Sequence, residues 1–283
     1  MALALATSQL LELSGIDAAR FANAQFANDV LALQAGRWQW NVWLSPQGRV
    51  RWFFALLRDT PERILLWLRG GDAEALRAEL AKFVFRSQVS LRVRTDLLAL
   101  GCDEAEVFAA VGACPERDLL AARDGALALR LPFGARWLLL TSLTVPSLNN
   151  ESAATQWQLD DIHAGLPMLD ASLQDQLLPQ WLGLDRLPAF STSKGCYPGQ
   201  EVIARLHFKG GNKRWLHHVS FACERLPSPG ARIADTGMLL NAVLVRAHRA
   251  EALAVLTDAA AASHAGNVGS EALSDIQVIS RFS

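Results

Sequence analysis

One short stretch decides how this chain is interpreted: Lys194-Gly195-Cys196-Tyr197-Pro198-Gly199-Gln200-Glu201. It predicts a thiol beside a tight turn, because glycine adopts backbone angles that a β-carbon forbids and Pro198 fixes φ just ahead of Gly199. A lysine two residues from a cysteine can stabilise the thiolate, the form that attacks electrophiles and binds metals. The stretch therefore indicates either a working thiol at Cys196, supported by Lys194, or a turn that carries an inert, half-buried cysteine.

Length and composition describe a folded protein of more than one domain. A chain of 283 residues predicts two domains or three small ones. Hydrophobic residues make up 51% and charged residues 19%, which favours an ample core over disorder. The net charge of −1 creates no global field toward nucleic acid or a membrane, so any such contact requires a local patch.

Cysteine usage and targeting signals predict a cytoplasmic protein with reduced thiols. The four cysteines form no C-x-x-C pair, and no Cys/His spacing matches a structural zinc site, so we expect no metal. The first 13 residues lack the basic opening of a secretory signal. No apolar run approaches the ~18 residues of a membrane span.

Hydrophobic periodicity predicts alternating helices and strands in the first part of the chain. We expect these elements in order: a helix over 17–33, strands over 37–44, 50–57 and 64–68, a helix over 73–84 and a strand over 89–93. Ser14 is expected to cap the first helix with Asp17 in a capping box, and Gly36 to end it. The strand, strand, helix, strand rhythm is typical of a ferredoxin-like part.

The remainder predicts one hairpin, two helices and a β-rich end. We expect a helix beginning near Asp103, a hairpin of 126–131 with 136–141, and a helix over 153–164. From Val202 onward the pattern alternates, with a hairpin turn at Gly210-Gly211-Asn212. Short strands separated by Gly and Pro predict a small barrel or sandwich there.

The opening stretch resembles the Lys-Gly-Cys-Tyr-x-Gly-Gln-Glu signature of the YgfZ family, relatives of the glycine-cleavage T-protein. Further similar blocks follow in family order over roughly the first three quarters of the chain: 14–18, 26–30, 45–49, 202–205 and 208–214. The resemblance implies an α+β fold with a three-part T-protein-like arrangement around a central channel. It implies a first α/β domain of 1–48 and 125–200, a ferredoxin-like domain of 49–124, and a C-terminal β-barrel of 201–283.

The resemblance also implies tetrahydrofolate or a derivative as cofactor, with Trp157, His163 and Tyr197 at its site. An indole such as that of Trp157 can stack on a pterin or aminobenzoyl ring, although most of the nine tryptophans must serve packing. The family usually has glutamate where this chain has His163, and neutral histidine offers only one donor and one acceptor. Ser8 stands in the place of a second family tryptophan, so altered folate affinity is expected.

The T-protein's catalytic aspartate lies in a loop matched here by 47–52, which holds no carboxylate. The resemblance therefore argues against glycine-cleavage aminomethyl transfer. No Gly-rich phosphate loop occurs, so nucleotide binding is not expected. Hydrolysis by a Cys–His pair is disfavoured too, because no histidine lies in a known local signature with Cys196.

A run of cations with interleaved rings predicts an anionic partner, either RNA or the glutamate tail of folate. The cations are Arg205, His207, Lys209, Lys213, Arg214, His217 and His218, and the rings are Phe208 and Trp215. The ordinary alternative is a hairpin with solvated lysines.

Together the residues and the resemblance predict a folate-dependent factor that assembles or repairs iron–sulfur clusters in client enzymes and so affects tRNA modification indirectly. Cys196 is its expected working thiol, with Gly195 and Gly199 shaping the loop and Gln200 and Glu201 anchoring it. The alternatives are a folate-dependent one-carbon transferase and a direct RNA-binding module.

Overall fold

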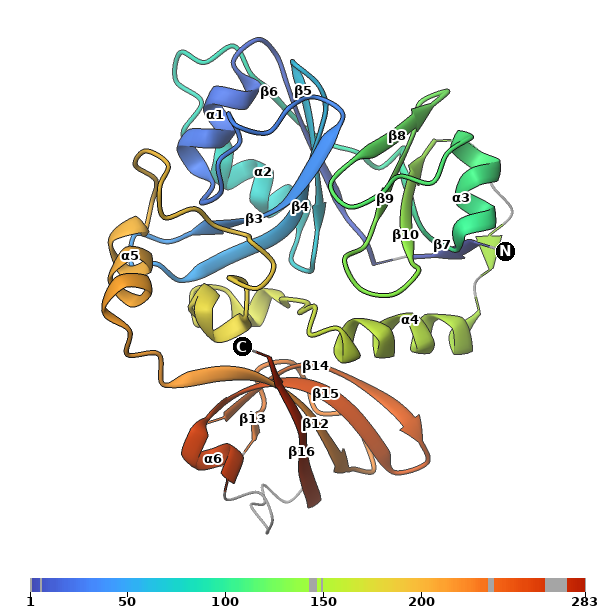
Figure 1. The fold of residues 1–283 in the computed structure, drawn as a ribbon, viewed down its shortest axis with the longest axis vertical. Coiled ribbons are helices and arrows are strands. Elements are labelled where there is room, and N and C mark those ends of the chain that lie inside the picture. The colour runs from blue at the N-terminus through green and yellow to red at the C-terminus, as the bar shows by residue number, and fades with distance from the viewer. Residues whose placement is uncertain are drawn as a thin grey trace. The chain divides into compact units, whose positions relative to one another are not determined.

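The computed structural model describes residues 2–5, 7–142, 147–148, 150–233, 237–262 and 274–282 (Figure 1). The fold mixes α and β, and the described strands form three sheets in which antiparallel pairs predominate. By its internal contacts the chain divides into two compact units, and each is described by itself. The first comprises Met1–Trp43, Trp52–Ala154 and Ala189–Tyr197; the second comprises Leu44–Arg51, Thr155–Pro188 and Pro198–Ser283.

One sheet of the first unit has five strands in the order β3-β4-β5-β2-β6. Their bounds are Leu10–Ser14 (β2), Arg37–Leu44 (β3), Val50–Thr60 (β4), Arg63–Leu68 (β5) and Ser90–Val93 (β6). Helices α1 (Ala18–Gln25) and α2 (Ala73–Ala81) share one core with this sheet, in which Leu11, Phe54 and Leu76 are fully buried. Burial of such apolar side chains is the main force that holds helix to sheet.

The other sheet of the first unit has six strands in the order β11-β1-β7-β10-β9-β8. Their bounds are Ala2–Ala4 (β1), Leu98–Cys102 (β7), Leu120–Arg123 (β8), Ala126–Arg130 (β9), Trp137–Thr141 (β10) and Ser147–Leu148 (β11). Helix α3 (Glu104–Val111) packs on it through Val107. Asp103 and Glu106 form a capping box at its start, which satisfies two backbone N–H groups that would otherwise lack partners.

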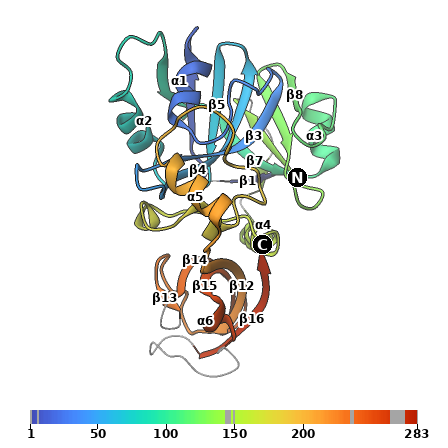
Figure 2. The ribbon, with the colours of Figure 1, turned by 60° about the vertical axis from the view of Figure 1, so that its left-hand side comes forward.

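The second unit carries a five-stranded sheet in the order β13-β14-β15-β12-β16, which curls into a half-barrel (Figure 2). The strands are Arg214–Ala222 (β12), Arg232–Ile233 (β13), Gly237–Arg246 (β14), Arg249–Thr257 (β15) and Ser274–Phe282 (β16). Its helical elements are α4 (Glu151–His163, in this unit from Thr155), η1 (Ala171–Leu173), η2 (Pro179–Leu182), α5 (Gln200–Lys209) and α6 (Asp258–Ala262). Register shifts in the β12–β16 and β14–β15 pairs add the twist that curling requires.

Most predicted elements of the first 164 residues are confirmed, but the first helix is much shorter than expected. It ends at Gln25, because Phe26 is extended and bridges to Trp43. Side chains then hold the following turns: Asn23 Oδ1 accepts from the Val30 N–H, and Asp29 Oδ1 from two N–H groups just beyond. Asn and Asp favour such local turns over helix.

Three smaller predictions at this helix are wrong. Ser14 ends strand β2 instead of capping the helix, and Asp17 takes the N-cap position without a side-chain hydrogen bond. Gly36, with φ +79°, lies in the turn before β3. The alternating pattern of β3 and the helical pattern of α1 were correct, so the error concerns the connection between them.

The prediction of strands from Val202 onward is also wrong at its beginning. Residues Gln200–Lys209 form helix α5, in which Ile203 is buried and the half-buried Leu206 lies one turn further on. Residues 210–212 link this helix to β12, so they are no hairpin turn. The three-part arrangement, the ferredoxin-like part and the predicted domain limits stay predictions. Across the described residues, no helix combines the length and apolar character needed to cross a membrane.

Candidate functional site

The first half of the 194–201 motif lies in the first unit, where Lys194 is buried with 9% exposure. Its ammonium donates hydrogen bonds to the backbone carbonyls of Asn23 (2.7 Å), Phe26 (2.6 Å) and Asn28 (3.0 Å). Burial lowers the pKa of Lys194 to about 8, while the charge of Asp29 acts in the opposite direction. The lysine thus ties its own loop to the segment that follows α1. Its predicted support of the Cys196 thiolate stays a prediction.

Tyr197 is the second buried side chain of this half. Its hydroxyl donates to the Ser191 carbonyl at 2.7 Å, and the Lys194 ammonium lies 5.0 Å from its ring centroid. Burial raises the pKa of Tyr197 to about 12, so the phenol stays protonated and can keep donating. Between these two anchored side chains, Cys196 is exposed. The loop is therefore held from within and presents its thiol outward.

The glycines of the motif differ from one another. Gly195 has no positive φ, and an added β-carbon would meet nothing within 4 Å. Gly199, in the second unit, has φ +80° and forms the N-cap of α5. A β-carbon there would lie 2.6 Å from the Ser45 carbonyl oxygen and 2.7 Å from Gly48 Cα. The expectation of a special backbone angle is correct for Gly199 and wrong for Gly195.

Gln200 and Glu201 begin helix α5, with Glu201 in its first turn. A carboxylate there is favoured by the partial positive charge of a helix N-terminus. Their expected role as hydrogen-bonding anchors of the loop stays a prediction.

The predicted cationic stretch is divided by the fold. Arg205 and Lys209 are exposed on α5, Lys213 is exposed in the link, and Arg214 begins β12 with its guanidinium 4.9 Å from the Trp181 ring. Phe208 on α5 is 73% exposed. This part of the predicted stretch is therefore an exposed cationic surface that includes one exposed aromatic ring.

Two of the seven expected cations do not belong to that surface. His217 and His218 are buried in β12, with exposures of 1% and 6%, and burial lowers the pKa of each. They are therefore neutral at pH 7. The inclusion of both histidines in a basic patch was wrong: successive residues of a strand point to opposite faces, and both faces of β12 are covered, since residues 216–221 are all buried.

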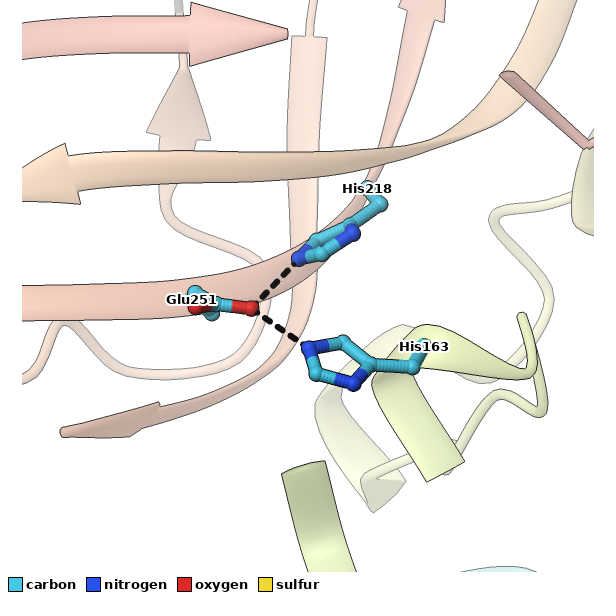
Figure 3. A group of neighbouring side chains, drawn as sticks. All are labelled: His163, His218 and Glu251. Carbon is cyan, nitrogen blue, oxygen red and sulfur yellow. Dashed lines mark hydrogen bonds and ion pairs between the residues drawn. The ribbon is translucent and has the colours of Figure 1, made fainter. Parts of the chain in front are cut away.

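Of the three residues expected at the folate site, Trp157 and His163 lie on α4 in the second unit, whereas Tyr197 belongs to the first unit. Trp157 is half-buried, and His163 is the last residue of the helix. His163 Nε2 forms a hydrogen bond with Glu251 Oε2 at 2.8 Å, and His218 Nε2 meets the same oxygen at 2.7 Å (Figure 3). Burial acts to raise the pKa of Glu251, but the bonds from His163 and His218 outweigh it and the pKa is lowered.

Sequence reasoning missed Glu251. The only signal was one carboxylate among the apolar residues of 250–256, a pattern in which a lone charge usually has a partner. Trp181 was missed too: Arg49, at 5.5 Å, and Arg214 both place guanidinium groups near its ring. In the loop matched to the T-protein's aspartate site, Arg51 pairs with Asp175 at 3.5 Å.

The sequence of this chain is similar to that of a curated protein. The chain is 34% identical over 171 residues to the tRNA-modifying protein YgfZ of Cronobacter sakazakii (strain ATCC BAA-894), a match that covers 55% of this chain and 52% of that protein. The chain thus matches about half the length of this curated relative. No protein-family model matches the sequence.

A solved structure shows the same fold. The glycine cleavage system aminomethyltransferase T from Bartonella henselae has a TM-score of 0.63 and 15% sequence identity, and the likeness covers 91% of this chain and 78% of that one. At that identity the likeness concerns the fold alone. The 194–201 motif and the aligned half of the chain fit the YgfZ family, and the fold is similar to that of the aminomethyltransferase.

Proposed function

We propose that this protein supports tRNA modification as a folate-dependent factor that assembles or repairs iron–sulfur clusters in client enzymes, with Cys196 as its working thiol. The observation that carries the proposal is the presentation of this one sulfur. Lys194 and Tyr197 on either side are buried and hydrogen-bonded, whereas Cys196 is exposed. Cysteine thiolates are the usual ligands of iron–sulfur clusters, so an exposed thiol on an anchored loop suits contact with a cluster that is the cargo.

The client class is proposed from the named relative. Its name describes a tRNA-modifying protein, and the aligned half supports a related role for this chain. Of the other three cysteines, Cys102 and Cys223 are buried, and burial raises the pKa of Cys102 to about 12. These two thiols suit packing, and the partly exposed Cys114 lies outside the motif with its Sγ 3.3 Å from the Glu104 carbonyl oxygen, so Cys196 is the better candidate for exchange.

A genetic test separates a working thiol from a structural one. Cys196→Ala and Cys196→Ser are expressed in a strain that lacks its own YgfZ, with Cys114→Ala as the matched control because Cys114 is partly exposed outside the motif. We expect both Cys196 variants to lose the rescue of a cluster-dependent tRNA-modifying enzyme, and the control to retain it. Full rescue by soluble Cys196→Ala would remove the thiol from the mechanism.

Of the two α4 residues proposed for the folate site, Trp157 supports the proposal and His163 does not. The half-buried indole of Trp157 can stack on an aromatic ring. The Nε2 atom of His163, however, already forms a hydrogen bond with Glu251. Only one ring nitrogen remains for folate, whereas the glutamate expected at this position would offer the pterin two acceptor oxygens. Folate, when bound, would supply one-carbon chemistry.

Calorimetry with tetrahydrofolate tests this part. We expect weak binding to the wild type, weaker binding to Trp157→Leu, and stronger binding to His163→Glu, which supplies a second acceptor. Equal affinity in all three proteins would remove both residues from a folate site, without bearing on Cys196.

A second candidate function is direct contact with RNA, favoured by the exposed Phe208 beside three exposed cations. Single-stranded RNA is held by phosphate contacts together with stacking on aromatic rings. We expect tRNA affinity to fall steeply with salt, and Arg205→Gln with Lys209→Gln to reduce that slope by roughly 1 per lost phosphate contact. Lys82→Gln, an exposed lysine of the first unit, is the control. Binding that is undetectable or insensitive to salt would exclude this candidate.

A further inference from the structure

Three side chains from separate segments of the second unit meet at one point: His163, His218 and Glu251 (Figure 3). His163 ends α4, whereas the other two lie on the adjacent strands β12 and β15. Glu251 is paired with Ser220 in the antiparallel register, so His218 is its diagonal neighbour two residues along. Diagonal neighbours on one face of a sheet lie within reach of long side chains.

The three groups direct their metal-binding atoms toward one another. Both imidazole Nε2 atoms contact the same carboxylate oxygen, at 2.8 Å and 2.7 Å, and one potential ligand atom from each residue lies within 4.8 Å of the other two. The two rings are 5.1 Å apart between centroids and tilted by 48°. Two imidazoles and one carboxylate are a common donor set for zinc and for other first-row metals.

The geometry requires little movement to accommodate an ion. Zinc binds nitrogen and oxygen ligands at about 2.0–2.2 Å in a tetrahedral arrangement, which places neighbouring ligand atoms roughly 3.4 Å apart. The N···O distances of 2.8 Å and 2.7 Å would widen by roughly 0.6–0.7 Å to reach that spacing, through side-chain rotation. His218 and Glu251 are largely buried, with side-chain exposures of 8% and 20%, and His163 at 48% leaves one side open to a water ligand.

We propose that His163, His218 and Glu251 bind a divalent transition-metal ion, with zinc as the ion that this donor set favours. The ion would join the C-terminal end of α4 to β12 and β15 within the second unit. Three protein ligands with one position open to solvent are typical of a zinc site that retains a water. The rival is a metal-free clamp in which the carboxylate only accepts hydrogen bonds from the two histidines.

Zinc binding to the full-length protein, stripped with chelator, distinguishes the two. Isothermal titration with zinc chloride is run on the wild type and on His163→Gln, whose half-exposed side chain can change with little effect on folding. His248→Asn is the matched control, because it removes an exposed histidine from the turn before β15, where φ is +60° and asparagine is well tolerated. Circular dichroism verifies that each variant is folded.

We expect one zinc equivalent in the wild type and in the control, and at least a tenfold loss of affinity in His163→Gln. Cobalt substitution should give the visible absorption of a tetrahedral ion in the wild type and not in His163→Gln. Glu251→Gln, if folded, should show the same loss. No zinc binding by the wild type, or equal affinity in wild type and His163→Gln, would overturn the proposal. In the first case a lower melting temperature of His163→Gln would favour the metal-free clamp. None of these readouts depends on folate or on Cys196.

Discussion

Replacing Gly199 by alanine tests whether the motif holds the 45–48 turn against the start of α5. Gly199 has φ +80°, and its Cα faces the turn so closely that a β-carbon would lie 2.6 Å from the Ser45 carbonyl oxygen. The opposing Gly48 is equally crowded: its own β-carbon would lie 2.8 Å from Val202 Cβ. Gly199 faces backbone atoms and Gly48 faces the Val202 β-carbon, and no side-chain rotation moves either of these obstacles away.

The structure sets the size of the expected effect. A left-handed backbone costs a residue with a β-carbon about 1–2 kcal/mol. Overpacking of a close contact adds about 1–3 kcal/mol. We therefore expect Gly199→Ala to lower the free energy of unfolding by roughly 2–5 kcal/mol, and the melting temperature by roughly 5–15 °C. Gly195→Ala is the matched control, because its β-carbon meets nothing within 4 Å and its φ is not positive.

Thermal melting and hydrogen exchange provide the readout. In the wild type the Gly48 N–H donates to Ser45 and the Val50 N–H donates to Leu177, both at 2.8 Å, so these amides should exchange slowly. Faster exchange at both amides is expected in Gly199→Ala, and wild-type exchange in Gly195→Ala. If Gly199→Ala and Gly195→Ala melted within about 1 °C of each other, the close approach of Gly199 to the 45–48 turn would not require a glycine.

Two further predictions concern the buried lysine and the thiols. Lys194→Met should lower the free energy of unfolding by about 2–4 kcal/mol and speed hydrogen exchange across 23–28, since three backbone carbonyls lose a charged donor. The exposed Lys213→Met should do neither. Equal melting temperatures of the two variants would contradict a stabilising role for the Lys194 hydrogen bonds. At pH 8, iodoacetamide should label Cys196 readily and Cys102 hardly at all, because burial raises the pKa of Cys102 to about 12 and its thiolate forms only as pH approaches that value. Rapid labelling of Cys102 in the folded protein, followed by mass spectrometry, would disprove its burial.

Local sequence pattern was sufficient to predict most helices and strands and to reveal a family resemblance. Strands such as β3 and helices such as α2 follow from side-chain periodicity, which any window of ten residues displays. The motif gave the resemblance to the YgfZ family because eight neighbouring residues carry it in order, and the curated relative fits that resemblance. The pattern failed at α5, where apolar residues are spaced so that a short helix and a strand compete. The helix forms there because Gly199 starts it in the left-handed region and Ile203 reaches the core.

The roles of the site residues depended on contacts between distant segments. Lys194 appeared to be a partner of the cysteine two residues away, yet its ammonium is held by carbonyls up to 171 residues earlier. His163 meets Glu251 across 88 residues, through strand register that no local window contains. Side-chain direction and burial arise only when faces pair in three dimensions, because the free energy of a buried charge depends on all the groups that surround it.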